Sequence, residues 1–564
     1  MKSDLEIARE AKIELIEDVA KRYGIERSDL ELYGDSKAKV KLSILDRLKD
    51  NPTGKYIDIT AISPTPLGEG KTTNTVGVTM GLTHIGKKAA CCIRQASLGP
   101  VFGIKGGAAG GGFAQVIPPE DLNIHLTGDI HAVQAANNLA CAFLDNHIKF
   151  GNELDIDVST IQLKRGMDIN DRDLREIITG LGGKKNGTPR ETGFDIAVAS
   201  EVMAILALAE DIHDMRKRFG KMVVAFNSKG EGVTCEQLKV AGAMTAIMRD
   251  AIKPNILQCI GGSLAFVHAG PFANIAHGNS SIVADRVALK VADYVVTESG
   301  FGADMGAEKF FNIKCRYSKL KPDAVGLIAT VRALKNQSGN FKVKPGKPLP
   351  EGLVQEDLAS LEKGMPNLTK HIQNCTGMGV PVVVAINVFG TETEAELEMV
   401  RKAALEAGAV SVCISEVFAK GGEGGADFAQ QLVDACEMPS DFKFTYELDM
   451  PIKDKISKLA QSYYGAEKVK FSPKASRNIK RFEKAGFSNL PICMAKTQYS
   501  FSHDPKLLGA PTGFTLPVVD AKLSAGAGFV YLICGDMMTM PGLSRTPGGE
   551  NIDIDKEGNI IGMF

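Results

Sequence analysis

The sequence predicts an α/β protein with one large domain, built on a mostly parallel sheet, and two smaller α/β domains. Three observations support this fold class. A glycine-rich loop with a lysine followed by two threonines, residues 63–73, stands between a strand-like run and a helix-like run. Apolar strand-like runs alternate with helical runs along the chain. The chain has 564 residues, which exceeds the size that one hydrophobic core usually supports.

A strand is predicted over 56–62. The glycine-rich loop follows it, and a helix predicted over 72–82 comes next. This layout is typical of a phosphate-binding loop and predicts a P-loop NTPase-like large domain. Lys71 is expected to reach the terminal phosphates of a nucleoside triphosphate and Thr72 to bind Mg²⁺, at the N-terminus of the helix. The residues expected to bind ATP are Thr65, Pro66, Leu67, Gly68, Glu69, Gly70, Lys71, Thr72 and Thr73.

This loop departs from the pattern G-x-x-x-x-G-K-[ST] at one position, since Thr65 replaces the first glycine. A glycine-rich turn without nucleotide is therefore the alternative interpretation. The strand before the loop and the helix after it favour the phosphate loop, because the motif requires that context.

Further strands are predicted over 88–93, 194–199, 222–226, 293–297 and 381–386. The segment 337–352 combines lysines with prolines and glycines, which is typical of an exposed connection. A second such segment covers 437–451. The predicted domains are therefore 1–345 (nucleotide-binding and catalytic), 346–455 (contributing to a second substrate site) and 456–564.

The amino-acid composition limits which partners and which cellular compartment are expected for this protein. The chain has 66 Lys and Arg against 67 Asp and Glu, which gives no electrostatic reason to expect nucleic acid or an anionic membrane as partner. No apolar run approaches the length that crosses a bilayer. Eleven cysteines occur without a C-x-x-C pair, so reduced core thiols are expected in place of disulfides or a zinc site. We expect a cytoplasmic protein that acts on small molecules.

Arg94 comes directly after the predicted strand 88–93, and so at the carboxyl edge of the sheet, where open α/β folds bind ligands. Its planar guanidinium can hold a carboxylate or an acyl phosphate. A structural arginine is the alternative. The glycines of 103–112 are bracketed by apolar residues, which favours close approach of the backbone to a ligand over a flexible linker.

Polar groups suited to proton transfer follow in two clusters. His125, Asp129 and His131 lie in the segment 123–131, and His268 opens a turn-rich segment, 268–279. Each histidine taken singly is more often a hydrogen-bonded structural residue than a catalyst. Proximity to the phosphate loop favours a catalytic role for the first cluster. In the second segment His268 is the preferred candidate, because His277 could instead cap a helix.

Together these motifs resemble the formate–tetrahydrofolate ligase family, over a span from about residue 33 to the end of the chain. The segments that carry the resemblance are 65–73, 97–100, 106–112, 126–129, 270–278, 301–304, 421–425, 495–499 and 535–542. The resemblance implies that formate attacks the γ-phosphate of MgATP to give formyl phosphate, and that N10 of tetrahydrofolate then takes the formyl group. Lys71 and Arg94 would act in the first step and His125, Asp129, His131 and His268 in proton transfer or positioning. Which of His125, Asp129 and His131 moves the proton stays open.

The resemblance also implies a homotetramer, activation by a monovalent cation (K⁺ or NH₄⁺), and an aromatic pair around the pterin. Phe301 should be the first member of the pair. The second falls on Phe418, where the family typically has tryptophan, because this chain contains no tryptophan. Other departures are Gln95-Ala96, Gly261, Ala269 and Gly390.

Two other functions fit parts of the sequence. One is a switch ATPase of the partitioning or metal-delivery kind, which would share the loop and the sheet. The other is a non-catalytic relative that binds folate or nucleotide, which the departures would favour.

Overall fold

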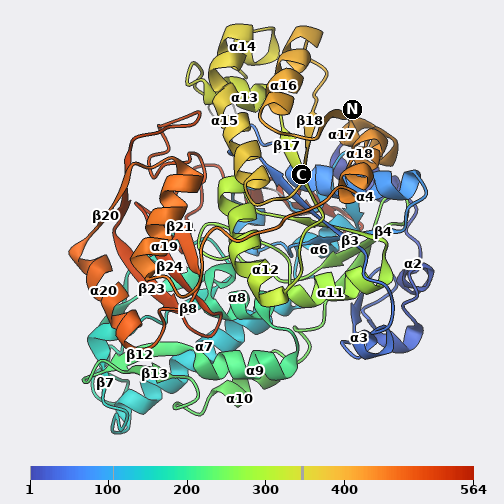
Figure 1. The fold of residues 1–564 in the computed structure, drawn as a ribbon. Helices are drawn as coiled ribbons and strands as arrows, with labels where there is room; N and C mark the ends of the chain where they lie inside the picture. Colours follow the sequence, from blue (N-terminus) through green and yellow to red (C-terminus); the bar gives the residue numbers. More distant parts are fainter. Residues whose placement is uncertain (1, 106, 344–347, 564) are drawn as a thin grey trace.

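The computed structural model describes residues 2–105, 107–343 and 348–563. Within these residues the protein is an α/β structure with one sheet of twelve strands and several sheets of two or three strands. Figure 1 shows the large sheet near the middle of the molecule with helices packed around it. The predicted class, a mixed α/β protein with a large and mostly parallel sheet, is confirmed.

Seven strands of the large sheet are parallel and run in the order β15-β4-β16-β3-β17-β18-β19. Their carboxyl ends therefore share one edge. Antiparallel strands β1, β2, β14, β6 and β5 extend the sheet beyond β15. The bounds are β1 Leu30–Leu32, β2 Ala38–Val40, β3 Lys55–Ala61, β4 Ala89–Ile93, β5 Gly110–Gly111, β6 Ala114–Ile117, β14 Asn255–Cys259, β15 Leu264–Val267, β16 Tyr294–Glu298, β17 Ala324–Ala329, β18 Val382–Asn387 and β19 Ser411–Ser415.

Helices cover both faces of this sheet, which explains why its parallel strands are apolar almost without interruption. Ile57 and Ile59 pack in one core cluster with α4 and α18, whereas Tyr56 belongs to the cluster that contains α11 and α15. Alternate residues of β3 thus serve opposite faces. The helices are α4 Lys71–His84, α11 Ile282–Val291, α15 Leu358–Thr376 and α18 Ala426–Cys436.

Two other parts of the chain flank the sheet. Helices α7 to α10 have their own hydrophobic cluster and lie at the bottom of Figure 1. The C-terminal elements at the left (orange and red) include α19, α20 and the small sheets β20-β22 and β21-β24-β23. The bounds are α7 Asp129–Lys149, α8 Glu201–Leu208, α9 Ile212–Lys221, α10 Ala241–Ile247, α19 Ile452–Leu459, α20 Pro473–Lys484, β20 Lys468–Phe471, β21 Ile492–Ala495, β22 Thr515–Val518, β23 Asp520–Ser524 and β24 Phe529–Ile533.

The strands predicted over 56–62, 88–93, 293–297 and 381–386 are confirmed as β3, β4, β16 and β18. Those predicted over 194–199 and 222–226 exist but lie outside the large sheet. Strand β11 (Phe194–Ile196) pairs with β8 (Arg165–Met167), and β12 (Val223–Asn227) is antiparallel to β13 (Gly232–Thr234) and β7 (Ile156–Asp157). A buried apolar run is the same in either setting, so its pattern does not reveal the partner strand.

The predicted boundary at 345/346 lies outside the described residues. Strands β18 and β19, which follow it in the chain, continue the large sheet beside β17. The segment 437–451 contains no helix or strand and ends where α19 begins. The division into three domains stays a prediction. All eleven cysteines are buried free thiols, as expected.

Candidate active site

The predicted phosphate loop connects β3 to α4 at the carboxyl edge of the parallel strands. Gly68 and Gly70 have φ of 74° and 71°, a conformation that glycine adopts without steric cost. Glu69 ties the loop together, because its Oε1 accepts hydrogen bonds from the Thr65 backbone N–H (2.7 Å) and hydroxyl (3.0 Å). Burial raises the pKa of Glu69 to about 7. The predicted succession of strand, loop and helix is present.

Lys71, the first residue of α4, lies near the side chains of Thr72, Arg94 and Glu298. Sequence reasoning selected Thr72 and Arg94 but not Glu298. The Thr72 hydroxyl donates to Glu298 Oε2 (2.8 Å), and Arg94 Nη2 lies 3.7 Å from Glu298 Oε1. Burial lowers the pKa of Lys71, and the Glu298 carboxylate opposes that shift. The carboxyl ends of β3, β4 and β16 therefore bring a lysine, a hydroxyl, an arginine and a carboxylate together.

Within the described part of the chain, the Arg94 guanidinium has protein partners at both terminal nitrogens but not at Nε. One Nη donates to the Pro271 carbonyl (3.3 Å), whereas Nε is buried and has no hydrogen-bond partner among the described residues. Gly300 gives the guanidinium its room, since a Cβ at that position would lie 3.1 Å from Nη1. A buried donor without a partner costs free energy, and ligand oxygens would satisfy it.

Phe418 lies beside the phosphate loop because helix α17 (Val417–Gly424) packs closely on α4. Gly77 of α4 permits this contact: a Cβ there would be 2.3 Å from the Val417 Cβ. Phe418 is 45% exposed and lines a cavity of about 800 Å³ together with Gly68, Thr73 and Phe389. The cavity joins an aromatic wall to the phosphate loop and has the size of a small-molecule site.

The glycine-rich segment approaches the protein itself at this wall. The Phe113 N–H donates to the Phe418 carbonyl (2.9 Å), and a Cβ on Gly112 (φ 57°) would lie 2.1 Å from that oxygen. Gly112 thus permits a close backbone contact, and the group that it approaches is the Phe418 carbonyl. Phe301, on the loop after β16, has φ of 61° and is not among the residues that line this cavity.

The predicted proton-transfer residues fall into two environments. His125 and His131 are both exposed, and their ring nitrogens Nδ1 and Nε2 are 2.6 Å apart. Asp129 is 2% exposed and fully engaged: Lys39 Nζ lies 2.7 Å from Oδ1, and Asn255 Nδ2 donates to Oδ2 at 2.7 Å. The structure therefore brings the two histidines together and holds Asp129 in a buried ion pair.

His268 is buried with both ring nitrogens satisfied by protein. Its Nε2–H donates to the Ala251 carbonyl (2.6 Å), and the Ser281 hydroxyl, which accepts from Ala284 N–H, donates to Nδ1 (2.6 Å). Burial lowers its pKa to about 4. These contacts favour a positioning role. His277, which we ranked lower, is also fully buried, and neither of its ring nitrogens has a partner among the described residues.

Known proteins are similar to this chain over its whole length. The family model described as formate–tetrahydrofolate ligase matches residues 2–564. A formate–tetrahydrofolate ligase of Desulforamulus reducens is 55% identical over 562 residues, covering 100% of this chain and 99% of the relative. Those of a Roseiflexus species and of Saccharopolyspora erythraea are 55% and 52% identical, covering all of this chain and 100% and 99% of their own lengths.

The chain belongs to the formate–tetrahydrofolate ligase family. The resemblance found in the sequence motifs is confirmed. Glu298 is a residue of the candidate site that sequence reasoning missed. The signal was present, because Glu298 directly follows the strand predicted over 293–297, at the same sheet edge as Arg94.

Two departures from the family pattern bear on backbone conformation, one unfavourably and one favourably. Ala269, where glycine is expected, has φ of 54°, which is strained for a residue with a Cβ by about 1–2 kcal/mol. Its carbonyl accepts from the Gln95 N–H (2.7 Å). Gly390 has φ of 79°, a conformation that proline cannot adopt. Gly261 has open space around it.

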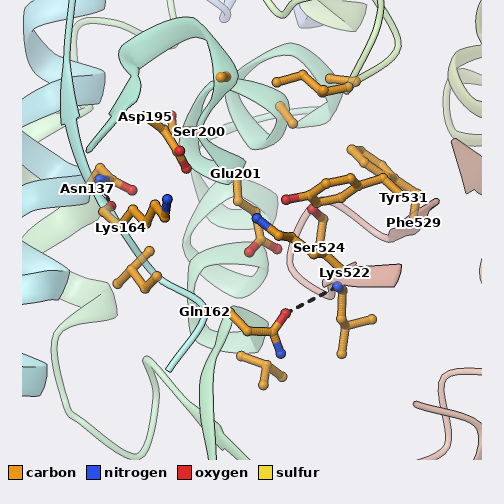
Figure 2. Close-up of a pocket in the computed structure, with 17 residues that line it drawn as sticks. Asn137, Gln162, Lys164, Asp195, Ser200, Glu201, Lys522, Ser524, Phe529 and Tyr531 are labelled. Atoms are coloured by element: carbon orange, nitrogen blue, oxygen red, sulfur yellow. Dashed lines mark hydrogen bonds between the residues drawn. The ribbon is translucent and has the colours of Figure 1, made fainter. Parts of the chain in front are cut away.

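A second cavity of about 60 Å³ lies between the α7–α8 part and the C-terminal strands. Figure 2 shows Lys164, Lys522, Asp195, Glu201 and Tyr531 around it. None of the predicted site residues lines it, and basic and acidic side chains face one another there. This balance favours a polar contact between two parts of the ligase-family fold over a second reaction centre.

Proposed function

We propose that this protein ligates formate to tetrahydrofolate with ATP, and that the products are 10-formyltetrahydrofolate, ADP and phosphate, formed through formyl phosphate. One observation carries the proposal. Lys71, Thr72, Arg94 and Glu298 converge at the carboxyl ends of three parallel strands, in a chain that matches the ligase family over nearly its whole length.

The phosphate loop supports phosphoryl transfer. In this proposal the large sheet and residues 65–73 act as a P-loop NTPase-like nucleotide site. Lys71 neutralises charge on the transferred phosphoryl group, and the backbone N–H groups at the start of α4 face the phosphates. Thr72 and Glu298 offer a hydroxyl and a carboxylate oxygen, donors that suit Mg²⁺ when substrate phosphates complete its shell. Bound there, Mg²⁺ would stabilise charge on the phosphate oxygens.

Arg94 supports the acyl step. Its guanidinium matches the planar arrangement of oxygens in formate and in formyl phosphate. Its buried Nε has no hydrogen-bond acceptor among the described residues. Glu298 contacts both Arg94 and Thr72, so one carboxylate links the formate end of the site to the phosphate end. Fixing the two reactants next to each other can lower the barrier by several kcal/mol.

The remaining roles follow from exposure and contacts. We assign the proton from N10 to the His125–His131 pair, which is exposed, and give Asp129 and His268 positioning roles, because protein partners occupy their polar atoms. Phe301 and Phe418 would stack on the pterin.

Among the described residues no helix is long and apolar enough to cross a membrane. A homotetramer, a cytoplasmic location, a monovalent cation activator and the absence of nucleic-acid partners stay predictions.

The test is an omission assay. Purified protein is incubated with formate, MgATP, potassium and tetrahydrofolate, and 10-formyltetrahydrofolate is followed while one reactant at a time is left out. Product that requires all three substrates is the expected result. ATP hydrolysis that ignores formate and folate would instead indicate a switch ATPase, and nucleotide binding without turnover would indicate a non-catalytic relative.

A further inference from the structure

A buried cluster of polar side chains lies at the start of the phosphate loop. Ser63, the first residue of the loop, has its backbone N–H donating to Asn367 Oδ1 (3.1 Å). The Asn367 Nδ2 donates both to Ser63 Oγ (3.0 Å) and to the Gly509 carbonyl (2.8 Å). The Ser63 hydroxyl also lies 3.1 Å from His371 Nε2. Three segments distant in sequence thus meet in one cluster.

The chemistry of these groups limits the hydrogen-bond directions in this cluster. Ser63 Oγ accepts from Asn367, and its hydroxyl hydrogen can point to His371 Nε2 in the ring tautomer that leaves this nitrogen unprotonated. Burial lowers the pKa of His371 to about 4, so the ring is neutral at neutral pH and can accept. Ser63, Asn367 and His371 are all 0% exposed. Water therefore cannot replace a partner that is removed.

Helix α15 and the C-terminal part hold this cluster from two sides. Asn367 and His371 are one helical turn apart on α15 and so present the same face. The His371 ring packs against Phe501, with ring centroids 4.5 Å apart. Figure 1 shows α15 (yellow) between the large sheet and the C-terminal elements. The start of the phosphate loop is thus anchored to a helix that also contacts the C-terminal part of the chain.

The same cluster reaches the loop that carries Phe301. A Cβ on Gly302 would lie 3.1 Å from His371 Cε1, 2.9 Å from Asp304 Oδ1 and 3.2 Å from the Ile62 carbonyl. Asp304 is paired with Lys496 at 2.6 Å, and both side chains are 0% exposed. His371 is therefore packed between the end of β3 and the Phe301–Gly302 turn.

We propose that Asn367 and His371 are positioning residues, which fix the start of the phosphate loop relative to the Phe301–Gly302 turn and thereby align the phosphate and folate ends of the site. This inference rests on the proposed ligase function. Neither side chain touches a reactant; each acts through Ser63. The glycine-rich loop has little rigidity of its own, and a misplacement of about 1 Å at a reacting centre can lower a rate about a hundredfold.

The experiment compares Ser63→Ala, His371→Phe and the double variant with wild type. Ser63→Ala removes only the hydroxyl, and His371→Phe keeps a ring against Phe501 but removes the acceptor. Each single variant should lower kcat by about three- to tenfold, the effect of one buried hydrogen bond, with a higher KM for MgATP. The double variant should be no worse than the poorer single variant, because both remove the same interaction.

Two comparisons separate positioning from a general loss of structure. Ser360→Ala, on the same helix, removes a buried hydroxyl that accepts from Asn340 Nδ2 (2.9 Å), and we expect it to leave kcat and KM unchanged. His371→Gln restores an acceptor and should recover part of the turnover that His371→Phe loses. If His371→Phe fails to fold, the comparison of Ser63→Ala with Ser360→Ala still tests the proposal.

The proposal is overturned if Ser63→Ala behaves like Ser360→Ala, or if the effects of Ser63→Ala and His371→Phe multiply in the double variant. Failure of the ligase function would look different: wild type would then form no 10-formyltetrahydrofolate in the omission assay. In that case calorimetric titration with MgADP still tests the cluster, because Ser63→Ala should weaken nucleotide binding about three- to tenfold and Ser360→Ala should not.

Discussion

The buried ion pair between Lys39 and Asp129 allows a test of whether Asp129 takes part in chemistry or holds structure. The two side chains are 1% and 2% exposed, with Nζ 2.7 Å from Oδ1. Removal of one partner leaves a charge buried without compensation, which costs about 3–5 kcal/mol. We therefore expect Asp129→Asn to lower the apparent free energy of unfolding by that amount. Replacing both residues, as Lys39→Met/Asp129→Leu, should recover most of the loss, because two apolar side chains need no partner.

Urea titration of wild type, Asp129→Asn and the double variant gives the stabilities, and steady-state turnover per folded enzyme gives the activities. Glu396→Gln is the matched control, since it breaks a second buried pair, Lys335–Glu396 (2.5 Å), on other helices. It should cost similar stability and leave turnover unchanged. If Asp129 only supports the fold, the double variant regains turnover together with stability. A stable double variant without turnover would refute this reasoning and assign the proton to Asp129.

Four further predictions address the site directly. Arg94→Ala should lower formate-dependent turnover by about 10²–10³-fold while MgADP affinity, measured by calorimetry, changes less than about threefold; equal losses would contradict its assigned role. Glu298→Gln should lower kcat at least tenfold and raise the Mg²⁺ concentration needed for half-maximal rate, measured by Mg²⁺ titration. Phe418→Trp should lower KM for tetrahydrofolate about two- to tenfold with little change in kcat. Wild-type stability should fall by about 3 kcal/mol between pH 6.5 and 4 through His268 alone, and His268→Gln should flatten that part of the urea-unfolding profile.

The sign of the last prediction follows from the two states of His268. In the unfolded chain the imidazole takes up a proton near pH 6.5, whereas burial holds the pKa of the folded one at about 4. Between these values the unfolded state binds more protons, so stability falls as the pH falls. Above pH 6.5 both states are neutral and the contribution is constant.

The sequence predicted best what depends on neighbours along the chain. The phosphate loop is recognisable because its strand, its glycines and Lys71 are consecutive, and the structure has them in that order. Arg94 was located by a general rule for strand ends. The spacing of Ser3 and Glu6 is likewise that of a capping box, which the structure has at the start of α1 (Asp4–Glu10).

What depends on distant residues was not readable from one sequence. Glu298 contacts a hydroxyl 226 positions away, and Asp129 pairs with a lysine 90 positions away. The same ambiguity applies to His268, because a histidine beside glycines has the same sequence context whether its ring faces a substrate or a carbonyl. Only the contacts with Ala251 and Ser281 distinguish the two.

Phe418 shows how such distant contacts limit what a substitution can change. Its backbone is held by the Phe113 N–H and by close approach of Gly112, and its ring edge lies 3.2 Å from the position of a Cβ on Gly111. The backbone at residue 418 therefore has little freedom, whereas the side chain is 45% exposed toward the cavity of about 800 Å³. A larger ring at this position would extend into the cavity and leave the glycine contacts intact. Phenylalanine in place of tryptophan should thus affect the area available for stacking on the pterin, and so folate affinity, without disturbing Lys71 or Arg94.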